Sequence, residues 1–200
     1  MCGVIRGVGT LSRDLFYLDV SQPFTNSLPP LVDIQSNLPV NNGWLTASAG
    51  GHNKSIIFSF GGWLYDLASG QSNNNYLVFT FQTPDGSWQI PLINGTSPIT
   101  TTYTGLYSSV KSVIDGNGKM YLFGGYNGNI TYNSMYILDT INSMWTKGND
   151  APSNRASAAG VLLKSGEIWY ISGFGVTNGT VVPVDINTVS MHQLSLKKKK

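Results

Sequence analysis

The sequence of 200 residues predicts an all-β protein made of repeated antiparallel sheets, with essentially no helix. Glycine occurs 23 times and aromatic residues make up 12% of the chain, a composition that suits strands joined by tight turns. Charged residues make up only 11%, against about 25% in an average globular protein. No stretch shows the sustained 3.6-residue periodicity that is typical of an amphipathic helix.

A unit of two apolar runs recurs along the chain. The first run ends in two glycines, and the second run ends seven residues before a tryptophan. One copy has its runs at 55–60 and 76–81, and the next copy has them at 119–123 and 135–138. The recurring positions are Gly61, Gly62 and Trp88 in the first copy and Gly124, Gly125 and Trp145 in the second.

A third, altered copy follows. The run 167–171 is followed by Ser172 and Gly173, so that serine replaces the first glycine. We expect Val184 to end the next strand of this unit, and Met191, seven residues later, to take the place of the tryptophan.

A partial unit precedes the first copy. Here the runs 15–18 and 31–34 predict the third and fourth strands of an earlier sheet. The sequence therefore predicts a single incomplete domain over 1–200. Its expected parts are a remnant at 14–40, sheets at 41–93 and 103–148, an incomplete sheet at 153–193 and a lysine-rich tail at 194–200.

The repeated pattern resembles the kelch repeat of the galactose oxidase/kelch superfamily, and the resemblance covers about 14–193. Residues 150–160, where arginine and small residues follow a proline, resemble the start of a kelch blade, and the overall style resembles fungal kelch proteins. The resemblance implies four-stranded blades packed face to face around a channel. It implies a partial propeller of about three to four blades, which we expect to be a fragment of a larger one, with apolar faces open at its ends.

In such blades, the second strand lies between neighbours, and a glycine pair lets the chain leave it where space is short and φ turns positive. Trp88 and Trp145 are expected to fill the gap between blades, each burying about 200 Å². These roles are structural, and they predict no catalytic residue.

The enzymatic alternative is a galactose-oxidase-like secreted propeller whose copper site has been lost. That family holds copper with two tyrosines and two histidines, and a thioether joins one tyrosine to a cysteine. This chain has His52, His192 and Cys2, none of them in a recognisable copper motif. We therefore expect a chain that is not an enzyme and that holds no cofactor or metal.

Other sites are excluded by their patterns. The segment 115–119 begins like a calcium loop, but its twelfth position is Tyr126 and not glutamate, so a hairpin turn is expected. Asp19, Asp139 and Asp185 recur at one repeat position, which indicates turn chemistry and not a catalytic acid.

Binding is the function that remains, with a protein or a glycan as the unknown partner. Its contacts are expected in the long loops 63–75, 94–104 and 126–133, which are rich in Asn, Tyr, Ser and Thr. Four of the 12 basic residues form the terminal lysine run, and the rest of the chain carries 8 basic and 10 acidic side chains, which argues against nucleic acid.

The sequence does not assign the protein to a cellular compartment. The N-terminus lacks the apolar core of a signal peptide, and no apolar run reaches the roughly 18 residues of a transmembrane helix. Four sequons would accept glycans in a secreted or cell-surface parent, although a chain this rich in Asn, Ser and Thr has about as many by chance. The candidate glycosylation sites are Asn53, Asn94, Asn129 and Asn178.

Overall fold

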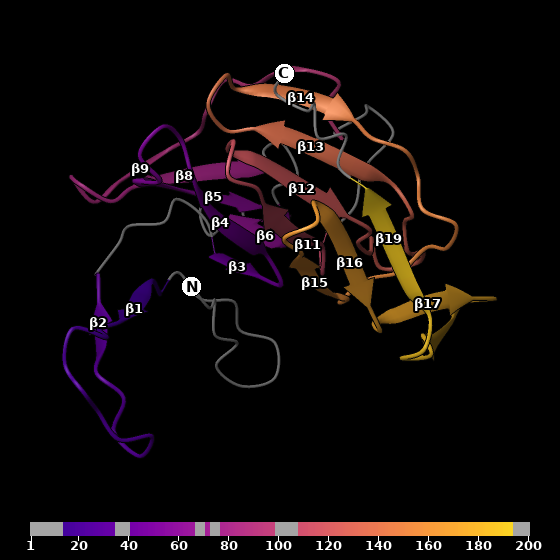
Figure 1. Ribbon diagram of the computed structural model, residues 1–200, viewed down its shortest axis with the longest axis horizontal. Coiled ribbons are helices and arrows are strands. Elements are labelled where there is room, and N and C mark those ends of the chain that lie inside the picture. Colours follow the sequence, from indigo (N-terminus) through magenta and orange to yellow (C-terminus); the bar gives the residue numbers. More distant parts are fainter. Residues whose placement is uncertain (1–13, 35–40, 67–70, 73–76, 99–107, 194–200) are drawn as a thin grey trace.

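The computed structural model describes residues 14–34, 41–66, 71–72, 77–98 and 108–193, and this part of the chain is all β (Figure 1). Three larger sheets follow one another: an N-terminal sheet of order β4-β5-β8-β9, a central sheet of order β10-β14-β13-β12-β11, and a C-terminal sheet of order β15-β16-β19. Within the described residues no helix is long and apolar enough to cross a membrane.

The strands of the N-terminal sheet are β4 (Thr46–Gly50), β5 (Ile56–Phe60), β8 (Val78–Gln82) and β9 (Ser87–Gln89). Those of the central sheet are β10 (Asn94–Gly95), β11 (Lys111–Ile114), β12 (Lys119–Phe123), β13 (Met135–Asp139) and β14 (Met144–Lys147). Those of the C-terminal sheet are β15 (Ala159–Leu162), β16 (Glu167–Ile171) and β19 (Val189–Gln193). Smaller sheets hold β1 (Phe16–Leu18) with β2 (Leu31–Asp33), β3 (Asn41–Gly43) with β6 (Trp63–Asp66) and β7 (Gln71–Ser72), and β17 (Phe174–Thr177) with β18 (Thr180–Pro183).

The N-terminal and central sheets share one antiparallel plan, β4-β5-β8-β9 in the first and β11-β12-β13-β14 in the second, in which each strand pairs with the next strand of its own sheet. The seven-residue spacing seen in the sequence is a cross-strand pair: Phe81 lies opposite Trp88, and Leu138 lies opposite Trp145. A tight turn between the third and fourth strands accounts for the spacing, because it sets the register of the two strands. β10 extends the central sheet by pairing in parallel with β14.

Two residues with positive φ directly follow the second strand of each sheet. The angles are 65° and 93° at Gly61 and Gly62, and 68° and 115° at Gly124 and Gly125. In the C-terminal sheet, Ser172 takes the first position with a φ of 59° and Gly173 the second with 98°. Space is short here as well, because a Cβ on Gly62 would lie 2.6 Å from the carbonyl oxygen of Gly43.

The C-terminal sheet departs from the plan expected from sequence. β16 pairs with β19, and Trp169 lies opposite Met191. Met191 is therefore in the third strand, and the expectation that Val184 ends the third strand and Met191 stands in the fourth was wrong. The reason is an inserted hairpin, β17–β18, whose two strands pair with each other and which separates the second strand from the third.

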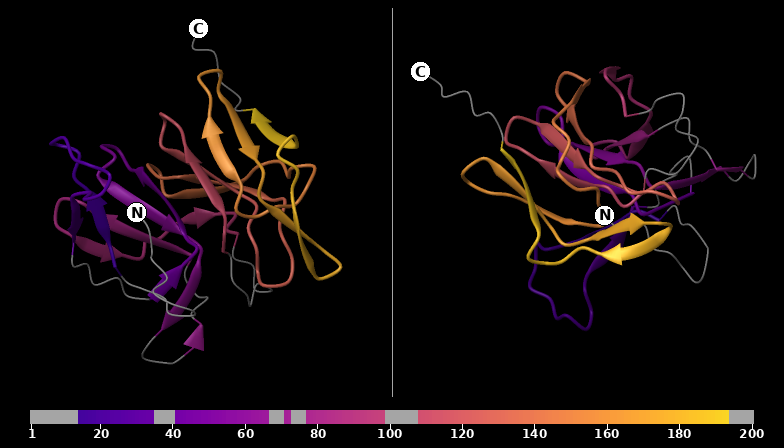
Figure 2. Two further views of the ribbon diagram at one scale, coloured as in Figure 1. Left: turned by 90° about the horizontal axis from the view of Figure 1, so that it is seen from below. Right: turned by 90° about the vertical axis from the view of Figure 1, so that its right-hand side faces the viewer.

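The three sheets stand side by side in chain order. β11 packs against β4 on one side and against β15 on the other, so the first strands form the innermost layer. Figure 2 shows the sheets splaying outward from this layer, and the β1–β2 hairpin lies beyond the N-terminal sheet. This is the arrangement of a partial propeller, and it confirms the predicted fold class.

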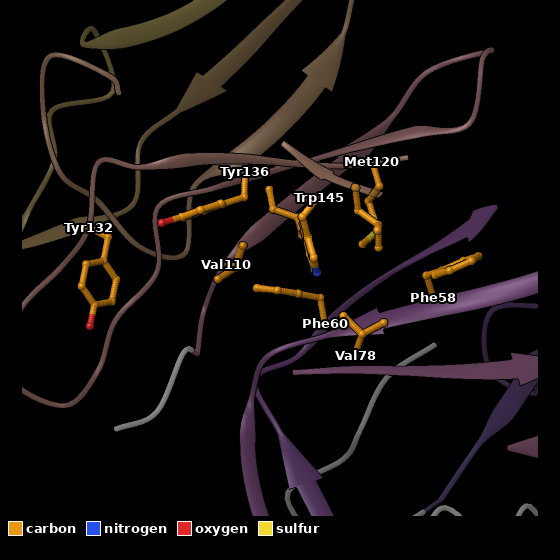
Figure 3. Close-up of a cluster of buried hydrophobic side chains, with 10 residues drawn as sticks. Phe58, Phe60, Val78, Val110, Met120, Tyr132, Tyr136 and Trp145 are labelled. Atoms are coloured by element: carbon orange, nitrogen blue, oxygen red, sulfur yellow. The ribbon is translucent and has the colours of Figure 1, made fainter. Parts of the chain in front are cut away.

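Two apolar layers fill the spaces between the sheets. The layer between the N-terminal and central sheets contains Phe58 and Phe60 on one side and Met120, Leu138 and Trp145 on the other (Figure 3). The layer between the central and C-terminal sheets contains Tyr121, Phe123 and Met135, with Ile168 and Tyr170 opposite them. Both layers use alternate residues of the second strand, because successive side chains of a strand point to opposite faces.

Candidate functional site

An aromatic residue follows the two positive-φ residues in each of the three sheets. These residues are Trp63, Tyr126 and Phe174. Each lies opposite a residue that precedes the first strand, and the pairs are Gly43 with Trp63, Ser108 with Tyr126, and Ala156 with Phe174. The repeat therefore places three aromatic rings at the same end of the strands.

Main-chain hydrogen bonds join the sheets at this end. The N–H of Ser109 donates to the carbonyl of Trp44 at 3.0 Å, and the N–H of Ser157 donates to the carbonyl of Ser109 at 2.8 Å. All three residues have a positive φ, of 55°, 58° and 54° respectively. Non-glycine residues rarely adopt this conformation, and it occurs here at equivalent positions of the repeat. The ladder therefore holds the three sheets in register where the aromatic rings emerge.

The rings form what we call the aromatic row: Trp44, Trp63, Tyr126 and Phe174. Trp44 stacks on Trp63 with ring centroids 5.9 Å apart and planes 10° apart. Tyr126 meets Phe174 edge to face at 5.6 Å. Trp44 is 50% exposed, and the other three residues are half-buried. The row thus offers large, oriented aromatic surface to solvent on a backbone that is held by hydrogen bonds.

Arg155 supports the row from inside. Its side chain is fully buried, and one guanidinium nitrogen donates to the carbonyls of Thr188 at 3.2 Å, Ser172 at 3.4 Å and Tyr170 at 3.5 Å. The other terminal nitrogen donates to the Ser153 hydroxyl at 3.0 Å. Burial lowers the pKa of Arg155 from its ordinary value. The side chain ties the end of β16 to the start of β19 and thereby fixes the base of the hairpin that carries Phe174.

The carboxylates serve as turn caps. Asp139 accepts main-chain hydrogen bonds from Ile141 and Asn142, and Asp185 accepts one from Asn187. Asp19 accepts one from Ser21, which holds the pKa of Asp19 below its usual value. These contacts confirm turn chemistry at the three aspartates. The expected common repeat position was wrong for Asp185, because it precedes the third strand β19, whereas Asp139 ends the third strand β13.

No three His, Cys, Asp or Glu side chains come together within the described part of the chain. His52 is exposed in the turn between β4 and β5, whereas His192 lies on β19 of another sheet. Cys2 lies outside the described residues.

The two repeat tryptophans have different surroundings. Trp145 is buried and contacts Phe60 of the preceding sheet. Trp88 is half-buried and meets Phe81 of its own sheet at 5.1 Å. Trp145 therefore lies between two sheets, as expected, whereas Trp88 lies on the face of the N-terminal sheet that is turned away from the central sheet.

The four sequon asparagines are exposed. Asn53 lies in the β4–β5 turn, Asn94 begins β10, Asn129 lies in the loop after Tyr126, and Asn178 lies at the tip of the β17–β18 hairpin. Among the expected binding loops, 67–70, 73–75 and 99–104 lie outside the described residues. The loops 63–75 and 126–133 both start at a residue of the aromatic row.

The row as a set was not predicted from the sequence, although a signal for it exists. An aromatic residue follows the Gly-Gly or Ser-Gly pair in all three units. Trp44 carries no such signal, because its stacking on Trp63 depends on the pairing of β3 with β6.

Comparison with known proteins agrees with this architecture. The model of the KLHDC2/KLHL20/DRC7 kelch-repeats domain matches residues 3–200. Among solved structures, the one titled "Structure of YjhT" superposes with a TM-score of 0.61 at 14% identity, over 86% of this chain. The chain spans 59% of the length of that protein, and the likeness concerns the fold alone. No curated protein matches the sequence. With a family match over nearly its whole length and the repeat geometry described above, the chain belongs to the KLHDC2/KLHL20/DRC7 kelch-repeat family.

Proposed function

We propose that this chain is a non-enzymatic kelch scaffold that binds a protein partner through the aromatic row. The observation that carries the proposal is the exposed stack of Trp44 on Trp63, which stands at the same end of the strands as Tyr126 and Phe174. Tryptophan and tyrosine are enriched among the residues that contribute most to protein interfaces. A rigid backbone beneath them lowers the entropy that is lost on binding.

The chemistry of the described residues favours binding over catalysis. The recurring aspartates cap turns, and Arg155, the fully buried guanidinium, is engaged by main-chain carbonyls. Aromatic rings with hydroxyl and amide groups around them suit contacts with a protein, and they also suit contacts with a neutral glycan.

The test compares Trp44→Ala with Met144→Ala. Met144 is 44% exposed and begins β14, at the opposite end of the strands, so it is a matched surface control. A partner protein is first identified with the unsubstituted chain and purified. Its affinity for each variant is then measured by titration calorimetry. We expect a loss of at least about tenfold for Trp44→Ala and no change for Met144→Ala.

Equal affinity of the two variants for the partner would place the binding site elsewhere. A parallel screen of neutral oligosaccharides against the same two variants separates the alternatives. Glycan binding that depends on Trp44, without a protein partner, would replace the proposed protein with a glycan. Turnover of a bound sugar would overturn the non-enzymatic assignment.

We also propose that the three sheets form part of a larger propeller. The outer face of the C-terminal sheet exposes Val161, and the neighbouring hairpin exposes Val181 and Val182. A further blade would cover this face as the C-terminal sheet covers the central one. Size-exclusion chromatography tests the idea, since a stable and cooperatively folding monomer of these 200 residues would contradict it.

A further inference from the structure

Five asparagines of the chain are each followed directly by a glycine: Asn42, Asn94, Asn117, Asn127 and Asn178. Asparagine is a chemically labile residue. Its side-chain amide is open to attack by the main-chain nitrogen of the next residue, and glycine hinders this nitrogen least because it has no Cβ. The attack requires a side chain that is free to turn and a following N–H that no hydrogen bond holds. The structure meets these requirements unequally at the five positions.

Asn178 and Gly179 form the tip of the β17–β18 hairpin, and both residues are exposed. Their φ angles are 50° and 74°, as in a two-residue type I′ turn, and the pair of Thr177 with Thr180 closes the turn. Within the described ranges, no hydrogen bond involves the side chain of Asn178 or the N–H of Gly179. A Cβ on Gly179 would meet nothing within 4 Å, so the space around this dipeptide is open.

Asn117 and Gly118 lie in the turn between β11 and β12, and Asn117 is exposed like Asn178. The N–H of Gly118 donates to the carbonyl of Asp115 at 3.2 Å, and the N–H of Asn117 donates to the carboxylate of Asp115 at 2.9 Å. The first bond occupies the attacking nitrogen, and the second holds the main chain of Asn117. The two dipeptides therefore share their exposure and differ in their hydrogen bonds.

Two further asparagines are held by burial or by their own side chain. Asn42 lies on β3 and is 4% exposed. The side-chain oxygen of Asn127 accepts hydrogen bonds from the N–H groups of Asn129 and Ile130, at 3.0 and 2.8 Å. These bonds fix the amide of Asn127, so that it is not free to turn toward the nitrogen of Gly128.

Asn94 is exposed, but its main chain belongs to the central sheet. The N–H of Asn94 donates to the carbonyl of Ser143 at 3.0 Å, and the N–H of Thr96 donates to the carbonyl of Trp145 at 3.3 Å. These bonds attach the residues on both sides of Gly95 to the central sheet. A Cβ on Gly95 would lie 2.3 Å from the carbonyl oxygen of Trp145, so the main chain has little room to rotate here.

We propose that Asn178 is the site at which the folded protein deamidates spontaneously. A base removes the proton of the Gly179 N–H, and the nitrogen attacks the side-chain carbonyl carbon of Asn178. A new C–N bond forms, the bond from that carbon to the amide nitrogen breaks, and the nitrogen leaves as ammonia after it takes a proton from solvent. Water then opens the cyclic imide at either carbonyl, which gives aspartate or isoaspartate.

The reaction changes the hairpin in two ways. Residues 174–183 contain no charged side chain, and the product places a carboxylate, ionised at neutral pH, at the tip. Isoaspartate also adds one carbon to the main chain, and a two-residue turn takes up this carbon only with a change in the pairing of its strands. The hairpin begins at Phe174, so the modification acts on the element that carries this ring of the aromatic row.

The test is incubation of the full chain in warm, mildly alkaline buffer, followed by peptide mapping with mass spectrometry and quantification of isoaspartate at all five sites. In the folded chain we expect Asn178 to convert at least about fivefold faster than Asn117, because the attacking nitrogen at Asn117 must first lose a hydrogen bond. In urea this difference should disappear, since both asparagines precede glycine and neither turn is formed.

Asn178→Gln is the control variant. Glutamine would have to close a larger ring and reacts far more slowly, so the modified peptide should be lost while the other four sites stay unchanged. Circular dichroism verifies that the variant and the unsubstituted chain are folded during the incubation. Equal rates at Asn178 and Asn117 in the folded chain, or a faster rate at any of the other sites, would overturn the proposal.

Discussion

The indole of Trp145 packs edge to face against the ring of Phe60, with centroids 5.8 Å apart and planes at 68°, and it thereby joins two sheets (Figure 3). Phe60 is 1% exposed and Trp145 is 5% exposed. Such an aromatic pair contributes about 0.5–1.5 kcal/mol beyond the area that it buries. The contact therefore stabilises the packing of one blade on the next, in addition to each blade by itself.

Trp145→Ala is expected to lower the free energy of unfolding by about 3–5 kcal/mol, because it opens a cavity between two sheets. Trp88→Ala is expected to cost clearly less, since Trp88 is half-buried and its ring contact is within its own sheet. Urea denaturation of both variants measures the difference. The loss of unfolding free energy in the double variant Phe60→Ala/Trp145→Ala should be smaller than the sum of the losses in the two single variants. Equal costs at Trp88 and Trp145 would contradict the assignment.

Gly124→Ala is expected to destabilise the protein by at least about 2 kcal/mol. Gly124 has a φ of 68°, and a Cβ there would lie 2.1 Å from the carbonyl oxygen of Arg155. Gly116→Ala provides the control, because a Cβ on Gly116 meets nothing within 4 Å, and its stability should stay within about 0.5 kcal/mol. Thermal and urea unfolding give both values. A neutral Gly124→Ala would mean that the close approach to Arg155 can relax.

Arg155→Met removes the donor that serves three main-chain carbonyls in a buried position. Carbonyls left without a partner cost about 1–3 kcal/mol each, so the expected loss is about 3 kcal/mol or more. Lysine carries one ammonium group in place of the planar fork, and Arg155→Lys should recover only part of the loss. Hydrogen exchange of the β19 amides should accelerate in Arg155→Met. Unchanged exchange there would exclude the proposed tie between β16 and β19.

Stability should fall in alkaline solution because of Tyr170, which is 1% exposed. Burial, together with the neighbouring Tyr121, raises the pKa of Tyr170 above its ordinary value of 10.0. The fold favours the neutral phenol, so this contribution is intact below pH 10 and is lost as the pH rises above that value. Tyr121 adds to the effect, since burial raises its pKa as well.

Tyr170→Phe is the matched variant for this prediction. Among the described residues the hydroxyl of Tyr170 has no hydrogen-bond partner, so its removal should leave stability at pH 7 unchanged or slightly higher. Urea midpoints between pH 8 and pH 11 should then fall less steeply than in the parent chain. Identical alkaline profiles for the two proteins would assign the effect to other groups.

The central sheet was predictable from local sequence. Lys119–Phe123 and Met135–Asp139 are apolar strands, and the register of Leu138 and Trp145 follows from the tight turn between β13 and β14. The C-terminal sheet was not predictable in the same way. Residues 174–183 form strands, but they pair with each other, and the third strand of the blade begins only at Val189. Strand propensity does not specify which partner a strand takes.

The aromatic row likewise combines features that follow from local sequence with features that depend on how the sheets pack. Tyr126 and Phe174 follow their glycine pairs in the sequence, and the repeat alone implies that they occupy equivalent places. Their contact at 5.6 Å, however, requires two neighbouring sheets to be set at the right angle. Trp44 reaches Trp63 only because β3 pairs with β6.

By itself, the sequence determined the kelch repeat, the positive-φ exits at Gly61-Gly62 and Gly124-Gly125, and the cross-strand place of each tryptophan. These features depend on neighbours a few residues apart, so local pattern is enough to define them. Only the tertiary structure decided that Trp145 lies against Phe60 and that Arg155 binds three carbonyls. Those features depend on how sheets pack on one another, and packing joins residues that no local pattern relates.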